Sequence, residues 1–207
     1  MSFDLIAPLY DTLSRVVFGR SLERAQLVLL PKIPPNSSIL LVGGGTGFLL
    51  AKLLADCQPT RILFLEASVA MLRRARCRVQ HHPLVGRVEF RHGTQVSLQS
   101  GEVFGVVIVP FVLDLFPEAT LRTHLLPPLL RVTAPGGHWL ATDFVNSPRL
   151  YHRLVLKTMY RFFRLVSGVE ARQLPDWPRL LSEAGLTSEE QAVAAGGQVQ
   201  TGWWVLT

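Results

Sequence analysis

The amino-acid sequence predicts an α/β fold in which helices cover both faces of a doubly wound sheet of seven strands. Two observations predict this fold. Short apolar runs alternate with helical stretches between residues 38 and 144, and strands joined through helices lie parallel to one another. The last two apolar runs, 188–194 and 200–206, have only a turn around Gly196 and Gly197 between them. The mostly parallel sheet should therefore end in an antiparallel C-terminal hairpin strand.

Local patterns place the individual elements along the chain. Apolar residues spaced by three and four predict helices, and uninterrupted apolar runs predict strands buried on both faces. The helices are expected at 3–17, 21–30, 48–55, 117–131, 150–166 and 176–184, and in the stretch that follows Ser68 and contains Met71 and Val79. Ser68 is the expected cap of that helix. The strands are expected at 39–42, 61–65, 87–91, 103–109, 138–144, 188–194 and 200–206. Pro127 and Pro128 should break or kink the helix that runs toward Arg131.

The composition indicates one folded domain. Hydrophobic residues make up 48% of the chain and charged residues 17%, which excludes disorder as the main description. A length of 207 residues suits a single domain, 1–207. The longest apolar run, 106–116, contains Asp114 and is too short for a membrane span. The N-terminus has neither the basic start nor the cleavage site of a signal peptide, so we expect a cytoplasmic protein.

Cysteine and histidine positions give no reason to expect a metal site. Cys57 and Cys77 fall in helical stretches with no second ligand at metal spacing, which is typical of buried or idle thiols. His81 and His82 are adjacent and precede Pro83, as in a solvated turn.

A glycine-rich turn follows the first strand, in the segment ILLVGGGTGFLL at 39–50. Gly43, Gly45 and Gly47 allow positive φ angles and a close approach of backbone to ligand. The N–H groups at the start of the next helix favour an electron-rich group. Dinucleotide folds place a third glycine or alanine where this chain has Phe48, and no Gly-Lys-Ser/Thr follows as in a P-loop. The structural alternative is a tight turn without a ligand.

An acid at the end of the second strand supports a nucleoside ligand. Glu66 lies 19 residues after Gly47, behind the apolar residues 62–65. A carboxylate in this place can accept hydrogen bonds from both hydroxyls of a ribose. The alternative is an exposed glutamate at a strand end.

Five segments in this order resemble the successive motifs of class I S-adenosylmethionine-dependent methyltransferases, which have a Rossmann-like fold. They are ILLVGGGTGFLL, ILFLEASVAMLRRAR, VEFRHGT, VVIVPFVLDLFPE and RVTAPGGHWLATDF, between residues 39 and 144. The opening FDLIAPLYDTLSRVVFG is similar to the branch that contains the ubiquinone and menaquinone biosynthesis methyltransferases. The resemblance implies N-terminal helices (1–36), a cofactor-binding core (37–144), a helical lid or substrate region (145–185) and a C-terminal hairpin (186–207).

The resemblance also implies a cofactor, a reaction and a set of roles. S-adenosylmethionine would be the cofactor, S-adenosylhomocysteine its product, and a small molecule the methyl acceptor. The loop against the methionine part would consist of Gly43, Gly44, Gly45 and Gly47, and Glu66 would hold the ribose. The adenine would be bordered by Ala67 and Met71, with Thr94 and Gln95 beside its edge. The backbone of Val109 and Pro110 would contact the cofactor's amino group, and Tyr10 would lean over the cofactor.

Two positions depart from the family pattern. Leu41 stands where the family usually has an acid that organises the loop and the cofactor's amino end, and Thr94 stands where an aspartate usually binds the adenine amine. A non-catalytic binding protein with weakened cofactor affinity is therefore the second hypothesis, and a dinucleotide-dependent enzyme is the third.

Methyl transfer from this cofactor requires few catalytic side chains. The sulfonium methyl is already activated, so the main task is to align the acceptor, and a base is needed only if the acceptor arrives protonated. Tyr10 and Asp114 are the candidate catalytic residues. Asp114 follows the fourth strand and Asp143 ends the fifth, and either could serve as base or orienting group. The alternative for Asp114 is an acid that starts the next helix, and the alternative for Asp143 is a solvated acid at a strand end.

A basic helix is expected in the region 149–166. Its cations are Arg149, Arg153, Lys157, Arg161 and Arg164. Steps of four, four, four and three place them on one arc of the helix, with apolar residues around the remainder. A core-packed helix with a solvated basic face is one interpretation, and contact with a membrane surface is a second. Nucleic acid is a third, which the scarcity of regularly spaced aromatic residues argues against. The sequence is also compatible with an oligomer.

Overall fold

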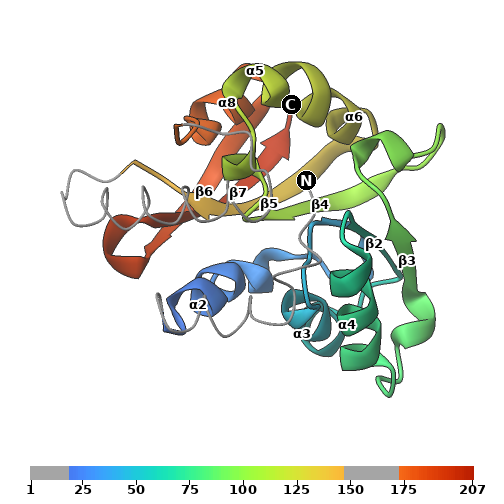
Figure 1. The fold of residues 1–207 in the computed structure, drawn as a ribbon. Helices are drawn as coiled ribbons and strands as arrows, with labels where there is room; N and C mark the ends of the chain where they lie inside the picture. Colours follow the sequence, from blue (N-terminus) through green and yellow to red (C-terminus); the bar gives the residue numbers. More distant parts are fainter. Residues whose placement is uncertain (1–18, 147–172) are drawn as a thin grey trace.

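The computed structural model describes residues 19–146 and 173–207, which form a sheet between two layers of helices (Figure 1). The strands are β1 (Ser38–Val42), β2 (Arg61–Glu66), β3 (Val88–His92), β4 (Phe104–Pro110), β5 (Thr133–Phe144), β6 (Leu186–Ala194) and β7 (Val199–Leu206). Their order is β3-β2-β1-β4-β5-β7-β6. Strand β7 runs antiparallel to β5 and β6, while β1 to β5 pair in parallel. The predicted fold class, including the antiparallel C-terminal strand, is confirmed.

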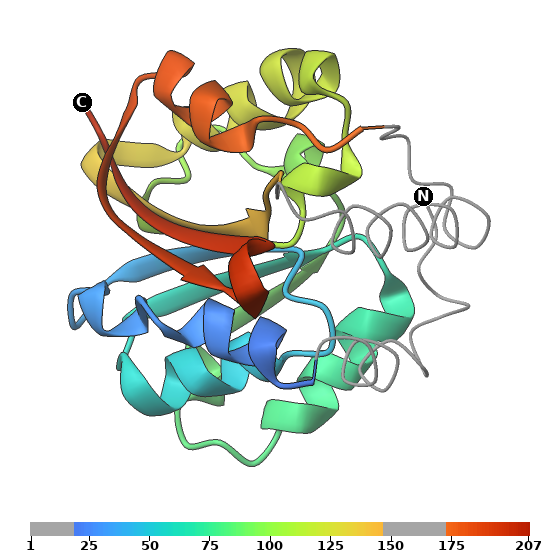
Figure 2. The ribbon, with the colours of Figure 1, turned by 90° about the vertical axis from the view of Figure 1, so that its left-hand side faces the viewer.

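Helices cover both faces of this sheet. One layer contains α2 (Ser21–Leu27), α3 (Phe48–Asp56) and α4 (Val69–Val79), and the other contains α5 (Glu118–Thr120), α6 (Leu126–Arg131) and α8 (Trp177–Glu183) (Figures 1 and 2). Within the described ranges, no helix is long and apolar enough to cross a membrane. The helices expected at 3–17 and 150–166 lie outside the described residues.

The strands divide the core into two halves. Leu40 and Val42 of β1 point to the half beneath α6 and α8, whereas Ile39 and Leu41 point to the half beneath α3 and α4. Three buried tryptophans, Trp139, Trp177 and Trp204, fill the first half. Because both faces of β1 are buried, its sequence is apolar without alternation, as parallel strands require.

The helix expected at 117–131 is interrupted, as its prolines predict. A π-helical turn, Leu121–Leu125, separates α5 from α6. Prolines stand in the first turn of α6, where a missing N–H costs little. The wide turn before them avoids the clash that a proline ring makes inside a regular helix.

Strand β5 begins earlier than expected. Thr133 pairs with Phe104 and His138 pairs with Val106, with an irregularity between these pairs. The segment 135–137 is therefore a bulge inside one strand, with Gly136 at a φ of 67°. The bulge lies at the far end of β5 from the cofactor-binding residues expected above.

Candidate cofactor-binding site

The loop between β1 and α3 contains three glycines in the left-handed region. Their φ angles are 65° at Gly43, 57° at Gly45 and 83° at Gly47. A Cβ on Gly43 would lie 2.5 Å from Val112 Cγ2, and a Cβ on Gly47 would lie 2.8 Å from Ala75 Cα. A Cβ on Gly45 would meet nothing within 4 Å. Gly43 and Gly47 thus serve packing, while Gly45 leaves open space for a ligand to approach the backbone.

Gly44 has a packing role of its own. A Cβ there would collide with the ring of Phe64, which belongs to the core half beneath α3 and α4 together with Leu41. Leu41 is fully buried and lends the loop no polar group. The loop is held instead by its backbone, because the N–H of Gly43 donates to the carbonyl of Leu65 at 2.8 Å.

Glu66 joins the end of β2 to this loop. Its side chain is only 6% exposed, so the interpretation as an exposed acid is wrong. The N–H of Gly45 donates to Oε2 at 3.0 Å, and the N–H of Ser68 donates to Oε1 at 2.9 Å. Burial raises the pKa of Glu66, and these backbone donors oppose the rise. Each carboxylate oxygen can accept one further hydrogen bond, so a diol can still bind.

The ends of β2 and β3 lie side by side. The N–H of Gly93 donates to the carbonyl of Glu66 at 3.0 Å, and Nε2 of His92 lies 3.1 Å from the carbonyl of Ala67. These contacts bring Ala67 near the segment that begins at Thr94. Ala67 and Thr94 are exposed and Gln95 is half-buried, whereas Met71 is buried in the first turns of α4. The residues expected around the adenine thus share one end of the sheet.

The segment after β4 forms another wall of the same end. Val109 and Pro110 are buried at the end of the strand. Phe111 follows with a φ of 53°, which is unfavourable for a residue with a side chain and typical of functional sites. Its N–H donates to the carbonyl of Thr142 at 2.7 Å. No feature of the sequence indicated this strained residue.

Val112, Phe111 and Phe144 line this wall with apolar groups. Val112 packs against Gly43, which connects the wall to the glycine loop. The rings of Phe111 and Phe144 are tilted by 49°, with centroids 5.5 Å apart. The half-buried ring of Phe111, packed on the buried Phe144, therefore gives an apolar face to the end of β4 and β5.

Two buried acids stand beneath this wall. Asp143 is fully buried, so its interpretation as a solvated acid is wrong. Its Oδ2 accepts from the N–H groups of Leu113 (2.8 Å) and Asp114 (3.1 Å), and its Oδ1 accepts from the N–H of Phe144 at 2.7 Å. Burial and the neighbouring Asp114 raise the pKa of Asp143 well above its ordinary value. Asp114 itself lies buried in a 3-10 turn, Leu113–Leu115, and does not start α5, which begins at Glu118.

Two further expectations concern parts of the chain outside the described residues. Tyr10 is one of them, and the basic region 149–166 is the other. Both remain predictions.

The described residues fit an adenosyl ligand. Gly45 offers open backbone, Glu66 offers a buried carboxylate with remaining acceptor capacity, and Val112 and Met71 offer apolar walls. The strand order also favours an adenosyl ligand over a dinucleotide. In this sheet the antiparallel strand β7 lies between β5 and β6, whereas the strand order of a dinucleotide fold has no such inserted strand.

Comparison with known proteins shows the family. A family model described as a methyltransferase domain matches residues 39–137. The chain is 30% identical over 194 residues to the ubiquinone/menaquinone biosynthesis C-methyltransferase UbiE of Geotalea daltonii, across 84% of this chain and 77% of that protein. It is 28% identical over 145 residues to the demethylmenaquinone methyltransferase of Lactiplantibacillus plantarum, across 68% of this chain and 60% of that protein.

A solved structure shows the same fold. The N-methyltransferase NodS from Bradyrhizobium japonicum, in complex with S-adenosylhomocysteine, superposes with a TM-score of 0.67 at 19% identity, covering 91% of this chain and 87% of that one. The chain belongs to the class I S-adenosylmethionine-dependent methyltransferases, and S-adenosylmethionine is its methyl donor. The hypothesis of a non-catalytic binding protein is not favoured by these similarities.

Proposed function

We propose that this methyltransferase acts on a small apolar acceptor of quinone-like chemistry. The observation that supports this most is the 30% identity to a quinone-biosynthesis methyltransferase, which extends over 77% of that protein. The opening segment of the chain, which is similar to the same branch, agrees with it. We place the reaction in the cytoplasm, with the acceptor presented at a membrane surface.

The cofactor would bind across the ends of β1, β2, β3 and β4. Gly45 and its neighbours would face the methionine part, Glu66 the ribose, and the residues Ala67, Met71, Thr94 and Gln95 the adenine, with the backbone of Val109 and Pro110 at the amino group. When bound, the cofactor supplies a methyl group that its sulfonium has already activated. The protein's remaining task is to hold the acceptor atom in line, at about 3 Å.

The acceptor would lie beyond the ends of β4 and β5. The half-buried ring of Phe111, which packs on the buried ring of Phe144, would offer it apolar contact. Asp114 is the proposed base or orienting group for an acceptor that carries a phenolic or enolic proton, and Tyr10 is the second proposed catalytic residue. Asp143 would hold Asp114 in place, because its Oδ2 accepts a hydrogen bond from the N–H of Asp114.

The region 149–166 is proposed to contact a membrane surface. Its five cations, without an acid between Asp143 and Glu170, suit anionic headgroups, and its apolar residues suit the acyl boundary. Such a position would deliver an apolar acceptor directly. A nucleic-acid acceptor is not proposed.

Methyl transfer itself tests the proposal. The full chain would be incubated with S-adenosylmethionine labelled in its methyl group and with one of two acceptors, a demethylated naphthoquinol in detergent or a water-soluble catechol. We expect label in the quinol and little in the catechol. Turnover of the catechol alone would contradict the apolar acceptor while leaving the enzyme class untouched.

A further inference from the structure

The segment between β3 and β4 has little to hold it in place through its own packing. It contains Thr94 and Gln95, the residues proposed to lie beside the adenine. Leu98 is its one buried apolar side chain, and Val96 is 80% exposed. A short 3-10 turn, Gln95–Ser97, is its regular structure. A loop with so few apolar contacts needs another source of order.

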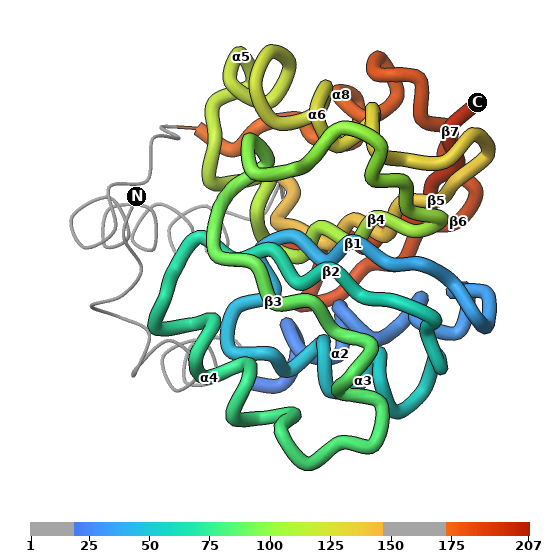
Figure 3. Tube along the Cα trace, turned by 90° about the vertical axis from the view of Figure 1, so that its right-hand side faces the viewer, coloured from blue at the N-terminus to red at the C-terminus, as the bar shows by residue number. Residues whose placement is uncertain are grey.

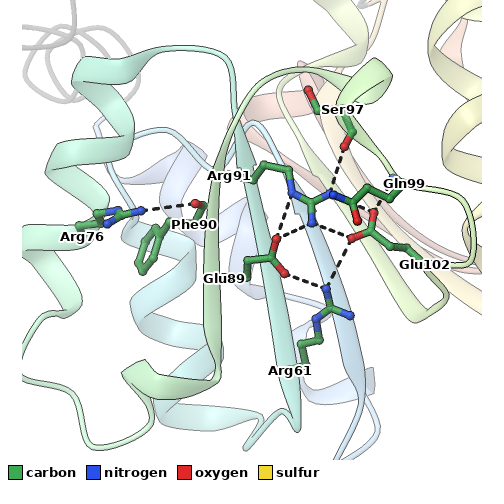
Figure 4. Close-up of polar contacts among 8 residues, drawn as sticks. All are labelled: Arg61, Arg76, Glu89, Phe90, Arg91, Ser97, Gln99 and Glu102. Atoms are coloured by element: carbon green, nitrogen blue, oxygen red, sulfur yellow. Dashed lines mark hydrogen bonds and ion pairs between the residues drawn. The ribbon is translucent and has the colours of Figure 1, made fainter.

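Arg91 of β3 supplies that order. Its guanidinium donates from Nη1 to the carbonyl of Ser97 at 3.1 Å. It also makes a bidentate pair with Glu102, from Nη1 to Oε2 at 3.0 Å and from Nη2 to Oε1 at 2.7 Å. Glu102 Oε2 in turn accepts from the N–H of Gln99 at 2.8 Å. Figure 4 shows the guanidinium bound to Ser97, in the middle of the loop, and to Glu102, near its end.

The pair is largely shielded from water. The side chains of Arg91 and Glu102 are 15% and 9% exposed, so salt screens their attraction weakly. Arg91 holds the pKa of Glu102 below its ordinary value, and Glu102 raises that of Arg91. Both shifts favour the charged forms of the pair. The planar guanidinium of Arg91 matches the two oxygens of the Glu102 carboxylate, so the pair fixes a geometry as well as contributing energy.

Two flanking residues extend the cluster along the outer strand. Glu89 pairs with Arg91 and also with Arg61 at 2.8 Å, and Arg61 lies 3.5 Å from Glu102. Two cations and two anions thus alternate beside β3, which is an outer strand of the sheet (Figures 3 and 4). Arg91 is the strand residue of this cluster that contacts the loop backbone, at the carbonyl of Ser97, whereas Glu102 belongs to the loop itself.

We propose that Arg91 is a positioning residue for adenine recognition, because its pair with Glu102 fixes the loop that presents Thr94 and Gln95. The proposal rests on the adenine site of the proposed function. It matters in this chain because Thr94 is uncharged. Neutral hydrogen-bonding groups discriminate between ligands only if they are held in place, so a loosened loop should lose selectivity for the base.

The test compares two ligands that differ at the purine edge. Dissociation constants of S-adenosylhomocysteine and S-inosylhomocysteine, in which hypoxanthine replaces adenine, would be measured by calorimetry. We expect the wild type to prefer the adenine ligand. In Arg91→Met that preference should fall about tenfold, which corresponds to roughly 1.4 kcal/mol, through a loss of affinity for the adenine ligand. Arg179→Met removes a surface ion pair between α8 and Glu118 of α5 (2.8 Å), neither of which belongs to the loop, and should change neither constant.

Two further variants and a hydrogen-exchange measurement keep the proposal falsifiable if Arg91→Met folds poorly. Glu102→Gln keeps the shape of the side chain and should reduce the preference in the same direction. Arg91→Lys keeps the positive charge but lacks the planar guanidinium, so it should keep only part of the wild-type preference for the adenine ligand. Hydrogen exchange at the amide of Gln99 should quicken in each variant.

The outcomes separate the two levels of the argument. Equal losses for both ligands, unchanged constants, or a wild type without preference would each overturn the positioning role of Arg91. A wild type that binds neither ligand would instead overturn the proposed adenine site itself.

Discussion

The backbone N–H of Gly45 donates to Oε2 of Glu66 across 3.0 Å. This bond joins the loop after β1 to the end of β2. It also brings Gly45 into contact with a buried carboxylate. Gly45 is the glycine of the loop where an added Cβ would have no atom within 4 Å. The open backbone of Gly45 and the carboxylate that we propose for the ribose are therefore built as one unit.

Replacement of Glu66 should weaken cofactor binding. In Glu66→Gln the amide can accept at one oxygen only, so it cannot satisfy two backbone donors and a diol. We expect S-adenosylhomocysteine affinity to fall by about 1.5–3 kcal/mol, the range for hydrogen bonds to charged groups. Titration calorimetry checks this, with the exposed Glu183→Gln as control. Equal affinities in wild type and Glu66→Gln would show that the carboxylate does not touch the ligand.

Cofactor affinity should depend on pH through the same residue. Burial raises the pKa of Glu66, and the ionised form is the better acceptor of hydroxyl donors. Affinity should be full above the raised pKa and should decline as the pH falls through it, earlier than for an ordinary glutamate. The Glu66→Gln variant should show a flatter profile. Parallel profiles for the two proteins would contradict this assignment.

Alanine at two glycines of the loop should separate packing from binding. Gly47→Ala meets the backbone of Ala75 at 2.8 Å and keeps a φ of 83°, so thermal unfolding should occur at a clearly lower temperature. Gly45→Ala has space for its methyl group and faces only the cost of its left-handed backbone, about 1 kcal/mol. It should instead weaken S-adenosylhomocysteine binding. A Gly45→Ala protein that binds like wild type would remove Gly45 from the site.

Asp143 should make the free energy of unfolding fall with rising pH. Its native pKa lies above the unfolded value, so the native state binds the proton more tightly. Its contribution is complete below the unfolded pKa and is lost as the pH rises through the native pKa. Asp143→Asn removes this dependence. Denaturant titrations between acidic and neutral pH should show the variant gaining stability relative to wild type as the pH rises, and a constant difference would contradict it.

Membrane contact through 149–166 should depend on charge. The full chain should sediment with vesicles of phosphatidylglycerol and phosphatidylcholine at low salt and be released at high salt. Replacement of Arg153, Lys157 and Arg161 by glutamine should abolish sedimentation. Glutamine at Arg73, Arg74 and Arg76, exposed arginines of α4, is the matched control. Equal loss with the control set would indicate a general effect of net charge.

The parts of the fold that sequence predicts are those with local causes. The apolar strand 39–42, the glycine turn and the Ser68 cap of α4 depend on neighbouring residues, and the structure contains all three, with Ser68 Oγ accepting from the N–H of Met71 at 3.2 Å. The pair of prolines in α6 likewise indicated an interruption that the π-helical turn provides.

The parts that sequence missed depend on distant contacts. Asp143 is buried because β7 inserts beside β5 and because the turn at Leu113 covers the strand end, and neither is visible near position 143. The φ of Phe111 has no local signal. Arg91 and Glu102 appear as ordinary surface charges until the loop between them closes onto β3.

A crystal structure of the full chain with S-adenosylhomocysteine tests the central claim most directly. The ribose hydroxyls should lie within hydrogen-bonding distance of Glu66, with the homocysteine part along Gly45 and the adenine between Met71 and the loop at Thr94. Density for the ligand away from the ends of β1 and β2, with Glu66 bound only by the N–H groups of Gly45 and Ser68, would contradict it.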